Sequence, residues 1–129
     1  MRPLDGVTVV ALEHVIAGPF CTRQLADLGA RIIKIERPGV GDPARAYDDR
    51  VHGMSSHFVW TNRSKESITL DLKQEAARRI VDQLLENADV LVQNLAPGAA
   101  TSRCRKRRGC RASSPTTRGR RCRTNTCSR

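Results

Sequence analysis

The fold is decided by residues 6–36, which read GVTVVALEHVIAGPFCTRQLADLGARIIKIE. Residues 6–13 form a β-branched run after a glycine, and this pattern is typical of a strand that is buried on both faces. A helix is expected over residues 17–30 and a second strand over residues 30–36. The three elements make a strand-helix-strand unit, whose crossover is expected to be right-handed. They place this part of the chain in the α/β class.

The expected helix carries its own start and stop signals. Gly18 and Pro19 open it, because proline suits the first turn of a helix. Gly29 stands where a residue in the left-handed conformation commonly ends a helix. We expect the apolar residues of this helix to share one face: Phe20, Cys21, Leu25 and Leu28.

A loop over residues 37–53, rich in glycine, proline and charge, separates this unit from two more strands. The third strand is predicted over residues 67–72 (SITLDL) and the fourth over residues 89–95 (DVLVQNL). Between them, Asp71 and Gln74 have the spacing of a capping box. The helix that follows has apolar residues at helical spacing: Ala77, Ile80, Val81, Leu84 and Leu85. We predict the first half of a Rossmann-like, doubly wound parallel sheet.

Charge divides the chain near residue 100. The 129 residues hold 23 Lys and Arg against 13 Asp and Glu, which gives a net charge of +10. Lys106 and ten arginines lie in residues 101–129 with no acidic residue, so the other 12 basic residues face all 13 acidic ones in residues 1–100. That nearly neutral body gives no electrostatic case for nucleic acid. We predict a partial domain over residues 1–100 and a disordered, Arg- and Cys-rich tail over residues 101–129.

Three explanations of the tail remain open at this point. Out-of-frame translation is favoured, because hydrophobic periodicity is lost at one point and only residue types such as Arg, Cys, Ser and Thr follow. A genuine basic arm would release counterions from a nucleic-acid backbone. A zinc site is the least favoured, since the four tail cysteines form no Cys-x-x-Cys pair and the tail has no histidine. We therefore predict no metal.

The rest of the chain gives little sign of export or membrane insertion. Cys21 is the single cysteine of residues 1–100, which indicates a reduced compartment. The apolar run near the amino terminus is too short for a signal sequence, and no segment approaches the length of a membrane span. We predict a cytoplasmic protein.

A dinucleotide site is disfavoured. Glu36 stands where a ribose-binding acid belongs, but the turn after the first strand, residues 13–21, has a single glycine in place of the three-glycine fingerprint. Several cations lie near the expected ends of the strands. Each alone is more often a solvated surface charge, but together they indicate an anionic ligand such as phosphate: Lys34, Arg37, Arg45, Arg63, Lys65 and Lys73.

Three segments carry a resemblance to a known family. They are residues 9–45 (VVALEHVIAGPFCTRQLADLGARIIKIERPGVGDPAR), residues 61–73 (TNRSKESITLDLK) and residues 89–98 (DVLVQNLAPG). In this order and spacing they resemble the amino-terminal part of the class III CoA-transferases, the family of formyl-CoA transferase and carnitine CoA-transferase. The resemblance implies an enzyme that moves coenzyme A (CoA) between an acyl-CoA and a carboxylic acid. It also implies an interlocked homodimer in the parent enzymes, and this chain holds only the first part of what interlocks.

The resemblance implies a set of CoA-binding residues by match. His14, Val15, Ile16 and Ala17 would lie beside the thioester end of CoA, and Arg37 would contact the nucleotide. The others would line the rest of the cleft, with the two lysines suited to phosphate: Lys34, Leu72, Lys73, Asn94 and Leu95.

The family's nucleophile is an aspartate that carries the acyl group as a mixed anhydride. It lies well beyond the NLAPG motif, and this sequence contains no Asp or Glu after Asp89. We therefore predict a truncated CoA-transferase without its nucleophile and without transferase activity. The alternative is a small basic protein that binds nucleic acid through an arginine-rich arm.

Overall fold

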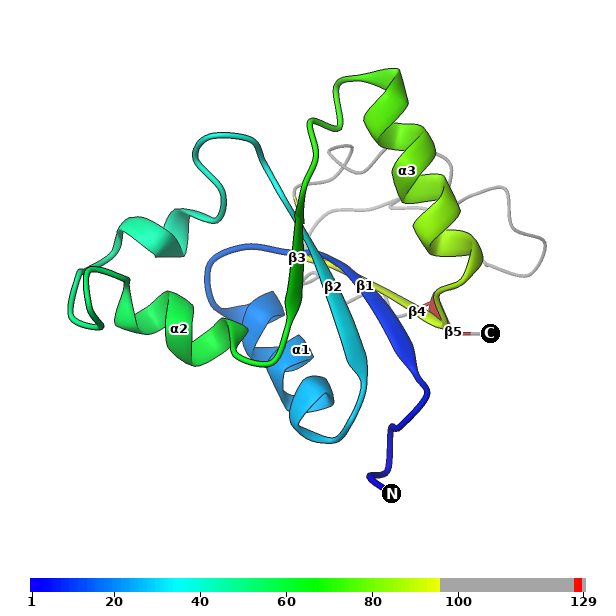
Figure 1. Ribbon diagram of the computed structural model, residues 1–129, viewed down its shortest axis with the longest axis horizontal. Helices are drawn as coiled ribbons and strands as arrows, with labels where there is room; N and C mark the ends of the chain where they lie inside the picture. The colour runs from blue at the N-terminus through cyan, green and yellow to red at the C-terminus, as the bar shows by residue number, and fades with distance from the viewer. Residues whose placement is uncertain (96–126, 129) are drawn as a thin grey trace, which may run out of the picture.

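The computed structural model describes residues 1–95 and 127–128 of this chain, and its strands form one sheet (Figure 1). The strand order is β3-β2-β1-β4-β5. All neighbours are parallel except β5, which pairs with β4 in the antiparallel sense. The strands are β1 (Thr8–Leu12), β2 (Arg31–Glu36), β3 (Glu66–Thr69), β4 (Val90–Gln93) and β5 (Cys127–Ser128).

The order of β1 to β4 is that of the first half of a doubly wound sheet, so the predicted fold class is confirmed. The chain moves outward from β1 to β3 and then returns to the other side of β1 to form β4. The predicted tail lies outside the described residues except for β5. The helices are α1 (Ala17–Asp27), the short 3₁₀ helix η1 (Pro43–Ala46), α2 (Ser56–Asn62) and α3 (Glu75–Glu86).

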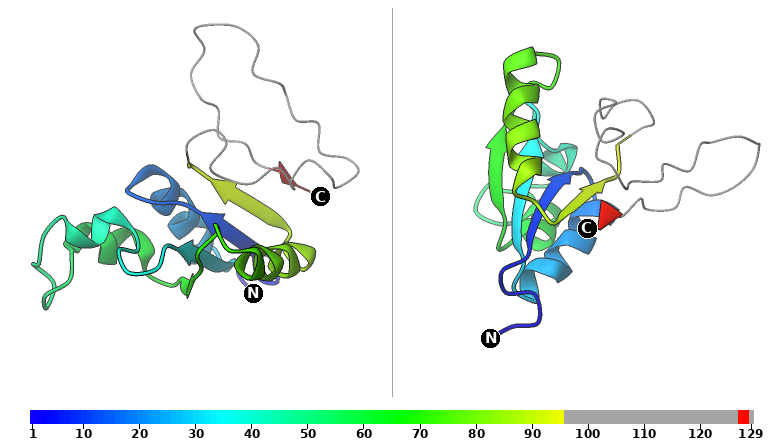
Figure 2. Two further views of the ribbon diagram at one scale, coloured as in Figure 1. Left: turned by 90° about the horizontal axis from the view of Figure 1, so that it is seen from above. Right: turned by 90° about the vertical axis from the view of Figure 1, so that its right-hand side faces the viewer.

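Strand β1 is buried on both faces, as its β-branched run predicts. Val9 and Ala11 belong to the apolar cluster that contains Ala26 of α1. Val10 and Leu12 belong to a second cluster, which contains Val81 of α3. Helices α1 and α3 therefore cover opposite faces of the sheet (Figure 2). Burial of these alternating side chains is the main apolar contribution to stability in this domain.

The buried face of α1 is not the predicted one. Phe20 is 38% exposed, Leu28 is 46% exposed and Cys21 is also exposed. Leu25, in contrast, packs against the apolar cluster that contains Ala26. The helix lies too close to the sheet for large side chains, since a Cβ on Gly18 would be 3.0 Å from Asn94 Cγ. Small residues make this approach possible, and the buried positions of α1 are Gly18, Pro19, Thr22 and Ala26.

The predicted capping box at Asp71 does not form. Helix α3 has Gln74 as its N-cap, without a side-chain cap. The Asp71 carboxylate instead accepts hydrogen bonds from Lys73 N at 3.0 Å and Gln74 Nε2 at 3.4 Å, which shapes the turn before the helix. The predicted apolar face of α3 is correct at Ala77 and Val81, whereas Ile80 is 38% exposed.

Helices η1 and α2 lie in a segment where no helix was expected. Pro43 and the Asp42 side chain start η1, and the Ser55 hydroxyl caps α2. These are local side-chain signals, and they are too short to produce a helical repeat of apolar residues. No helix within residues 1–95 is long and apolar enough to cross a membrane.

We predict that Gly29→Ala destabilises the domain by about 2 kcal/mol. Gly29 has φ +110°, and a Cβ there would lie 2.5 Å from Asp5 Oδ1 and 2.9 Å from Arg2 Cβ. Gly39→Ala is the matched control, because Gly39 has φ +75° with nothing within 4 Å of an added Cβ. The free energy of unfolding in urea should fall less for the control, and equal losses in both variants would contradict the close packing at Gly29.

Candidate functional site

The predicted site residues gather at one edge of the sheet. The carboxyl ends of parallel strands share an edge, and open α/β sheets bind their ligands there. Nine of the ten predicted residues follow directly after one of β1 to β4 along the chain. They are His14, Val15, Ile16 and Ala17 after β1, Arg37 after β2, Leu72 and Lys73 after β3, and Asn94 and Leu95 after β4.

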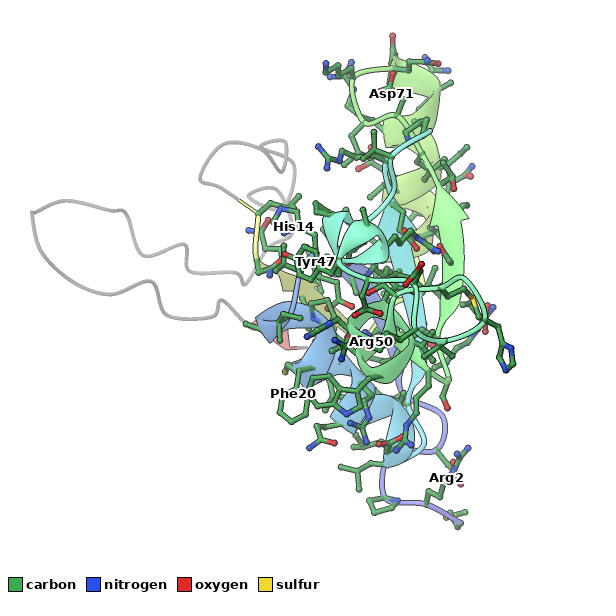
Figure 3. The ribbon with its side chains drawn as sticks, turned by 90° about the vertical axis from the view of Figure 1, so that its left-hand side faces the viewer. Arg2, His14, Phe20, Tyr47, Arg50 and Asp71 are labelled. Carbon is green, nitrogen blue, oxygen red and sulfur yellow. The ribbon has the colours of Figure 1, made fainter. Side chains whose placement is uncertain are left out.

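The centre of this edge is the turn between β1 and α1. The chain reverses its direction across the sheet between β1 and β4, which makes this the topological switch point. Asn94 Oδ1 accepts a hydrogen bond from His14 N at 3.0 Å, and Asn94 Nδ2 donates to His14 O at 2.9 Å. Figure 3 shows His14 beside the end of β4. The structure therefore brings two separately predicted segments into contact.

The first turn of α1 points unpaired backbone amides toward this edge. Ile16 is the N-cap and provides no side-chain cap, and Pro19 has no N–H. Among the described residues, the amides of Ile16, Ala17 and Gly18 have no hydrogen-bond acceptor. Unpaired amides and the helix dipole together favour an oxygen atom with negative charge at this end of the helix.

Arg37 lines an open pocket of about 260 Å³ at the ends of β2 and β3. Its side chain is exposed, and it makes no ion pair with a described residue. The other residues that line the pocket are Glu36, Gly39, Val40, Gly41, Arg45, Ser67 and Thr69. The pocket is polar and open, as a site for a nucleotide or phosphate requires.

The Glu36 carboxylate is already hydrogen-bonded by neighbouring side chains, so it is not free to bind a ribose as the acid of a dinucleotide site would. Arg45 donates two hydrogen bonds to its carboxylate, at 2.8 and 2.9 Å, and Ser67 Oγ donates a third at 2.8 Å. Burial alone would raise the pKa of Glu36, but these hydrogen bonds outweigh it and lower the pKa to about 2. The geometry agrees with the rejection of a dinucleotide site.

Most of the cations that suggested an anionic ligand are neutralised by the protein itself. Arg45 pairs with Glu36 and Arg63 with Asp27. Lys65 is buried beside Glu13, and burial lowers its pKa although Glu13 acts in the opposite direction. Of the six predicted cations, Arg37 and Lys73 make no ion pair within the described part of the chain.

Lys34 also differs from its predicted role. Its side chain is 1% exposed, and its Nζ lies 2.5 Å from Asp42 Oδ2 and 2.7 Å from Asn62 Oδ1. An ammonium group that is buried and paired in this way is not presented to a phosphate. Lys34 therefore has a structural role in this arrangement, and we remove it from the candidate CoA contacts.

The pairing partners are the residues that sequence reasoning missed. Asp42 and Asn62 lie in the segments 9–45 and 61–73 that carry the family resemblance, but neither was singled out as a site residue. Both lie in the interior beneath the β1–α1 turn, where they join Lys34 and Lys65. Among residues 1–95, no group of three His, Cys, Asp or Glu side chains could hold a metal ion.

Comparison with known proteins identifies the family. The model of CoA-transferase family III matches residues 4–116, so this chain belongs to that family, and the resemblance seen in its sequence is confirmed. An acetyl-CoA:oxalate CoA-transferase of Acetobacter aceti is 51% identical over 96 residues, covering 74% of this chain and 25% of that protein. A succinyl-CoA:glutarate CoA-transferase of Mus musculus is 46% identical over 99 residues, covering 76% and 23%. The chain thus spans about a quarter of the length of these relatives.

Solved structures agree with this assignment. A hypothetical protein of Mycobacterium tuberculosis, Rv3272, superposes with a TM-score of 0.70 at 38% identity, covering 76% of this chain and 27% of that one. A CAIB/BAIF family protein from Brucella suis gives a TM-score of 0.68, covering 73% and 26%. The fold described here is therefore the one that family members adopt in this region.

We predict that the Glu36 carboxylate makes the domain sensitive to acid. Its pKa of about 2 in the folded state lies below its ordinary value of 4.5, so its stabilising effect is complete above pH 4.5 and is lost as the pH falls toward 2. Between pH 7 and pH 3 this loss is about 2 kcal/mol. Glu36→Gln should flatten the pH dependence of the free energy of unfolding by that amount.

The matched control for this experiment is Glu75→Gln. Glu75 is exposed and pairs with Arg79 on the surface of α3, so its removal should leave the acid sensitivity of the wild type in place. An unchanged pH dependence in Glu36→Gln would show that the Arg45 and Ser67 contacts do not hold the carboxylate in its charged form.

Proposed function

We propose that residues 1–95 are the CoA-binding part of a family III CoA-transferase that passes CoA from an acyl-CoA to a dicarboxylic acid. The observation that carries this proposal is the gathering of nine predicted residues at the carboxyl edge, with Asn94 bound to His14 at the switch point. Relatives with oxalate and glutarate in their names support a dicarboxylate acceptor.

The residues of this edge have separate proposed tasks. The unpaired amides of the α1 first turn suit the carbonyl oxygen of the thioester, where negative charge develops during transfer. Arg37 and Lys73 suit the phosphates and nucleotide of CoA. Leu72 and Leu95 pack against the apolar cluster that contains Val81 of α3, and they supply an apolar wall for the rest of the cofactor.

Transfer itself requires a carboxylate that attacks the thioester carbonyl, forms an acyl anhydride and releases CoA as the thiolate. The carboxylates nearest to the β1–α1 turn cannot do this. Glu13 and Asp42 have side chains that are 0% exposed, and each is bound to a lysine. Residues 96–129 contain no Asp or Glu. We infer that this 129-residue chain binds CoA without transferring it.

Several sequence predictions remain part of this proposal. They are the domain boundary at residue 100, the out-of-frame origin of residues 101–129 and the cytoplasmic location. The alternative of nucleic-acid binding rests on the eleven basic residues of the tail, which the described residues do not test. Retention on RNA that falls steeply with salt would favour that alternative.

We predict that CoA raises the Tm of this chain in a concentration-dependent way, since a ligand that binds only the folded state stabilises it. Arg37→Ala and Lys73→Ala should each weaken CoA binding by about tenfold, because each removes a charge-assisted contact to a phosphate. Arg31→Ala is the control, as it removes the same charge at the amino end of β2. No stabilisation of the wild type at millimolar CoA, or equal weakening by Arg31→Ala, would contradict the proposed site.

The absence of transfer is tested separately. We expect the wild-type chain, mixed with succinyl-CoA and oxalate, to form no oxalyl-CoA above the uncatalysed background. Product formation at a rate proportional to protein concentration would show that a carboxylate of this chain does act as a nucleophile.

A further inference from the structure

Val15, in the turn between β1 and α1, has a conformation that needs outside support. Its φ is +69°, in the left-handed region that β-branched residues rarely adopt. Such a conformation is strained and persists only where surrounding contacts hold it. The turn leads directly into the amides of Ile16 and Ala17, so whatever holds Val15 also sets the direction of the first turn of α1.

Asp42 supplies that support from a distant part of the chain. Its Oδ1 accepts hydrogen bonds from Val15 N and from Ala44 N, both at 2.9 Å. Its Oδ2 is bound to Lys34, and its side chain is 0% exposed. Because the same oxygen binds both amides, Asp42 joins the β1–α1 turn to the loop after β2. An apolar residue at this position would leave the Val15 amide without its acceptor.

Asp42 belongs to a ring of hydrogen-bonded groups that starts and ends in the turn, and its charged side chains are buried. Lys34 shares Asn62 Oδ1 with Lys65, at 2.7 and 3.2 Å. Lys65 in turn donates to Glu13 Oε1 at 2.8 Å. Glu13 stands two residues before Val15, so the chain itself closes the ring. We call this set the polar ring: Glu13, Lys65, Asn62, Lys34, Asp42 and Val15.

The polar ring contains two positive and two negative side chains, and all four charged groups are at most 2% exposed. Removing one charge from such a pair leaves its partner buried and uncompensated, which is strongly destabilising, whereas replacing both partners by apolar groups is often tolerated. Stability and positioning can therefore be separated by changing pairs of residues together.

We propose that Asp42 is a positioning residue for CoA. It does not touch the ligand. It acts through the Val15 amide, which fixes the turn and thereby aims the free amides of the α1 first turn. This inference rests on the proposed function, because it takes CoA as the ligand at this edge. It adds that CoA affinity depends on the acceptor at residue 42 and not on the ion pair as such.

Two double variants isolate that acceptor. Lys34→Met/Asp42→Asn removes the ion pair but keeps a carbonyl oxygen where Oδ1 accepts both amide hydrogen bonds. Lys34→Met/Asp42→Leu removes the ion pair and the acceptor and keeps the branching at Cγ, with methyl groups in place of the two carboxylate oxygens. Neither variant leaves a buried charge without a partner, so we expect both to fold. Near-ultraviolet circular dichroism and the Tm establish that they do.

The measurement is the Kd of CoA by calorimetry, at a temperature well below the lower of the two Tm values. We expect the Leu variant to bind CoA at least tenfold more weakly than the Asn variant. The amide resonances of Val15 and Ala17 should also move further from their wild-type positions in the Leu variant. Equal CoA affinities in the two folded variants would overturn the proposal.

A third variant tests whether any damage to the polar ring has the same effect. Glu13→Gln/Lys65→Met removes the other ion pair and the bond from Lys65 Nζ to Pro19 O, and it leaves the bond between Asp42 and Val15 in place. We expect a lower Tm with CoA affinity within about threefold of the wild type. A loss as large as that of the Leu variant would show that damage anywhere in the polar ring weakens CoA binding, and it would overturn the specific role of the Asp42 acceptor. If the wild type itself does not bind CoA, the proposed function fails, whereas equal binding by the two Lys34 double variants overturns only the role of Asp42.

Discussion

The carboxyl edge of this domain depends on the Asp42 carboxylate, which is buried beneath the turn that follows β1 and accepts the amides that hold this turn. Lys34 Nζ lies 2.5 Å from Asp42 Oδ2, and both side chains are almost completely excluded from solvent. A carboxylate is retained in the interior only where its charge and its lone pairs are satisfied. Lys34 satisfies the charge, and the amides of Val15 and Ala44 satisfy the remaining oxygen. The turn, the loop after β2 and the strand itself are thus held by one side chain.

This constraint explains how a short segment keeps a strained turn at the proposed ligand site. Asn94 holds the backbone of His14 from β4, and Asp42 holds the amide of Val15 from the loop after β2. The turn is fixed from two sides by residues far away in the sequence, so the amides of α1 stay aimed at the switch point. Preorganised amides of this kind stabilise developing negative charge without having to reorganise during the reaction. The fold of this part of the chain therefore supports the proposed binding function.

The sequence predicts the strands and the fold class well, because β-branched runs such as that around Val9 and Val10 are typical of buried strands in a parallel sheet. Prediction from the sequence fails where the environment of a side chain depends on close packing or on a partner that is distant in the sequence. The buried face of α1 consists of small residues, which a search for large apolar side chains overlooks, so Phe20 and Leu28 were assigned to the wrong environment. Helix α2 begins at a serine cap and is too short for a periodic signal.

At the candidate site, too, some features could be predicted from the sequence and others depend on contacts between distant residues. Residues that follow the strand ends, such as Asn94, could be placed at the edge from the family resemblance alone. The sequence records the cations but not their partners, which lie up to 52 positions away in the pair of Glu13 and Lys65. Lys34 therefore looked like a phosphate contact and is in fact part of the interior.

The central claim is that CoA binds at the carboxyl edge, and the most direct test is the change in backbone amide chemical shifts when CoA is added to the isotope-labelled chain. Our account predicts changes at Ala17, Gly18, Arg37, Lys73 and Asn94, with none at Arg31 and Glu66 at the opposite edge. Changes concentrated at Arg31 and Glu66, or no changes at millimolar CoA, would contradict it.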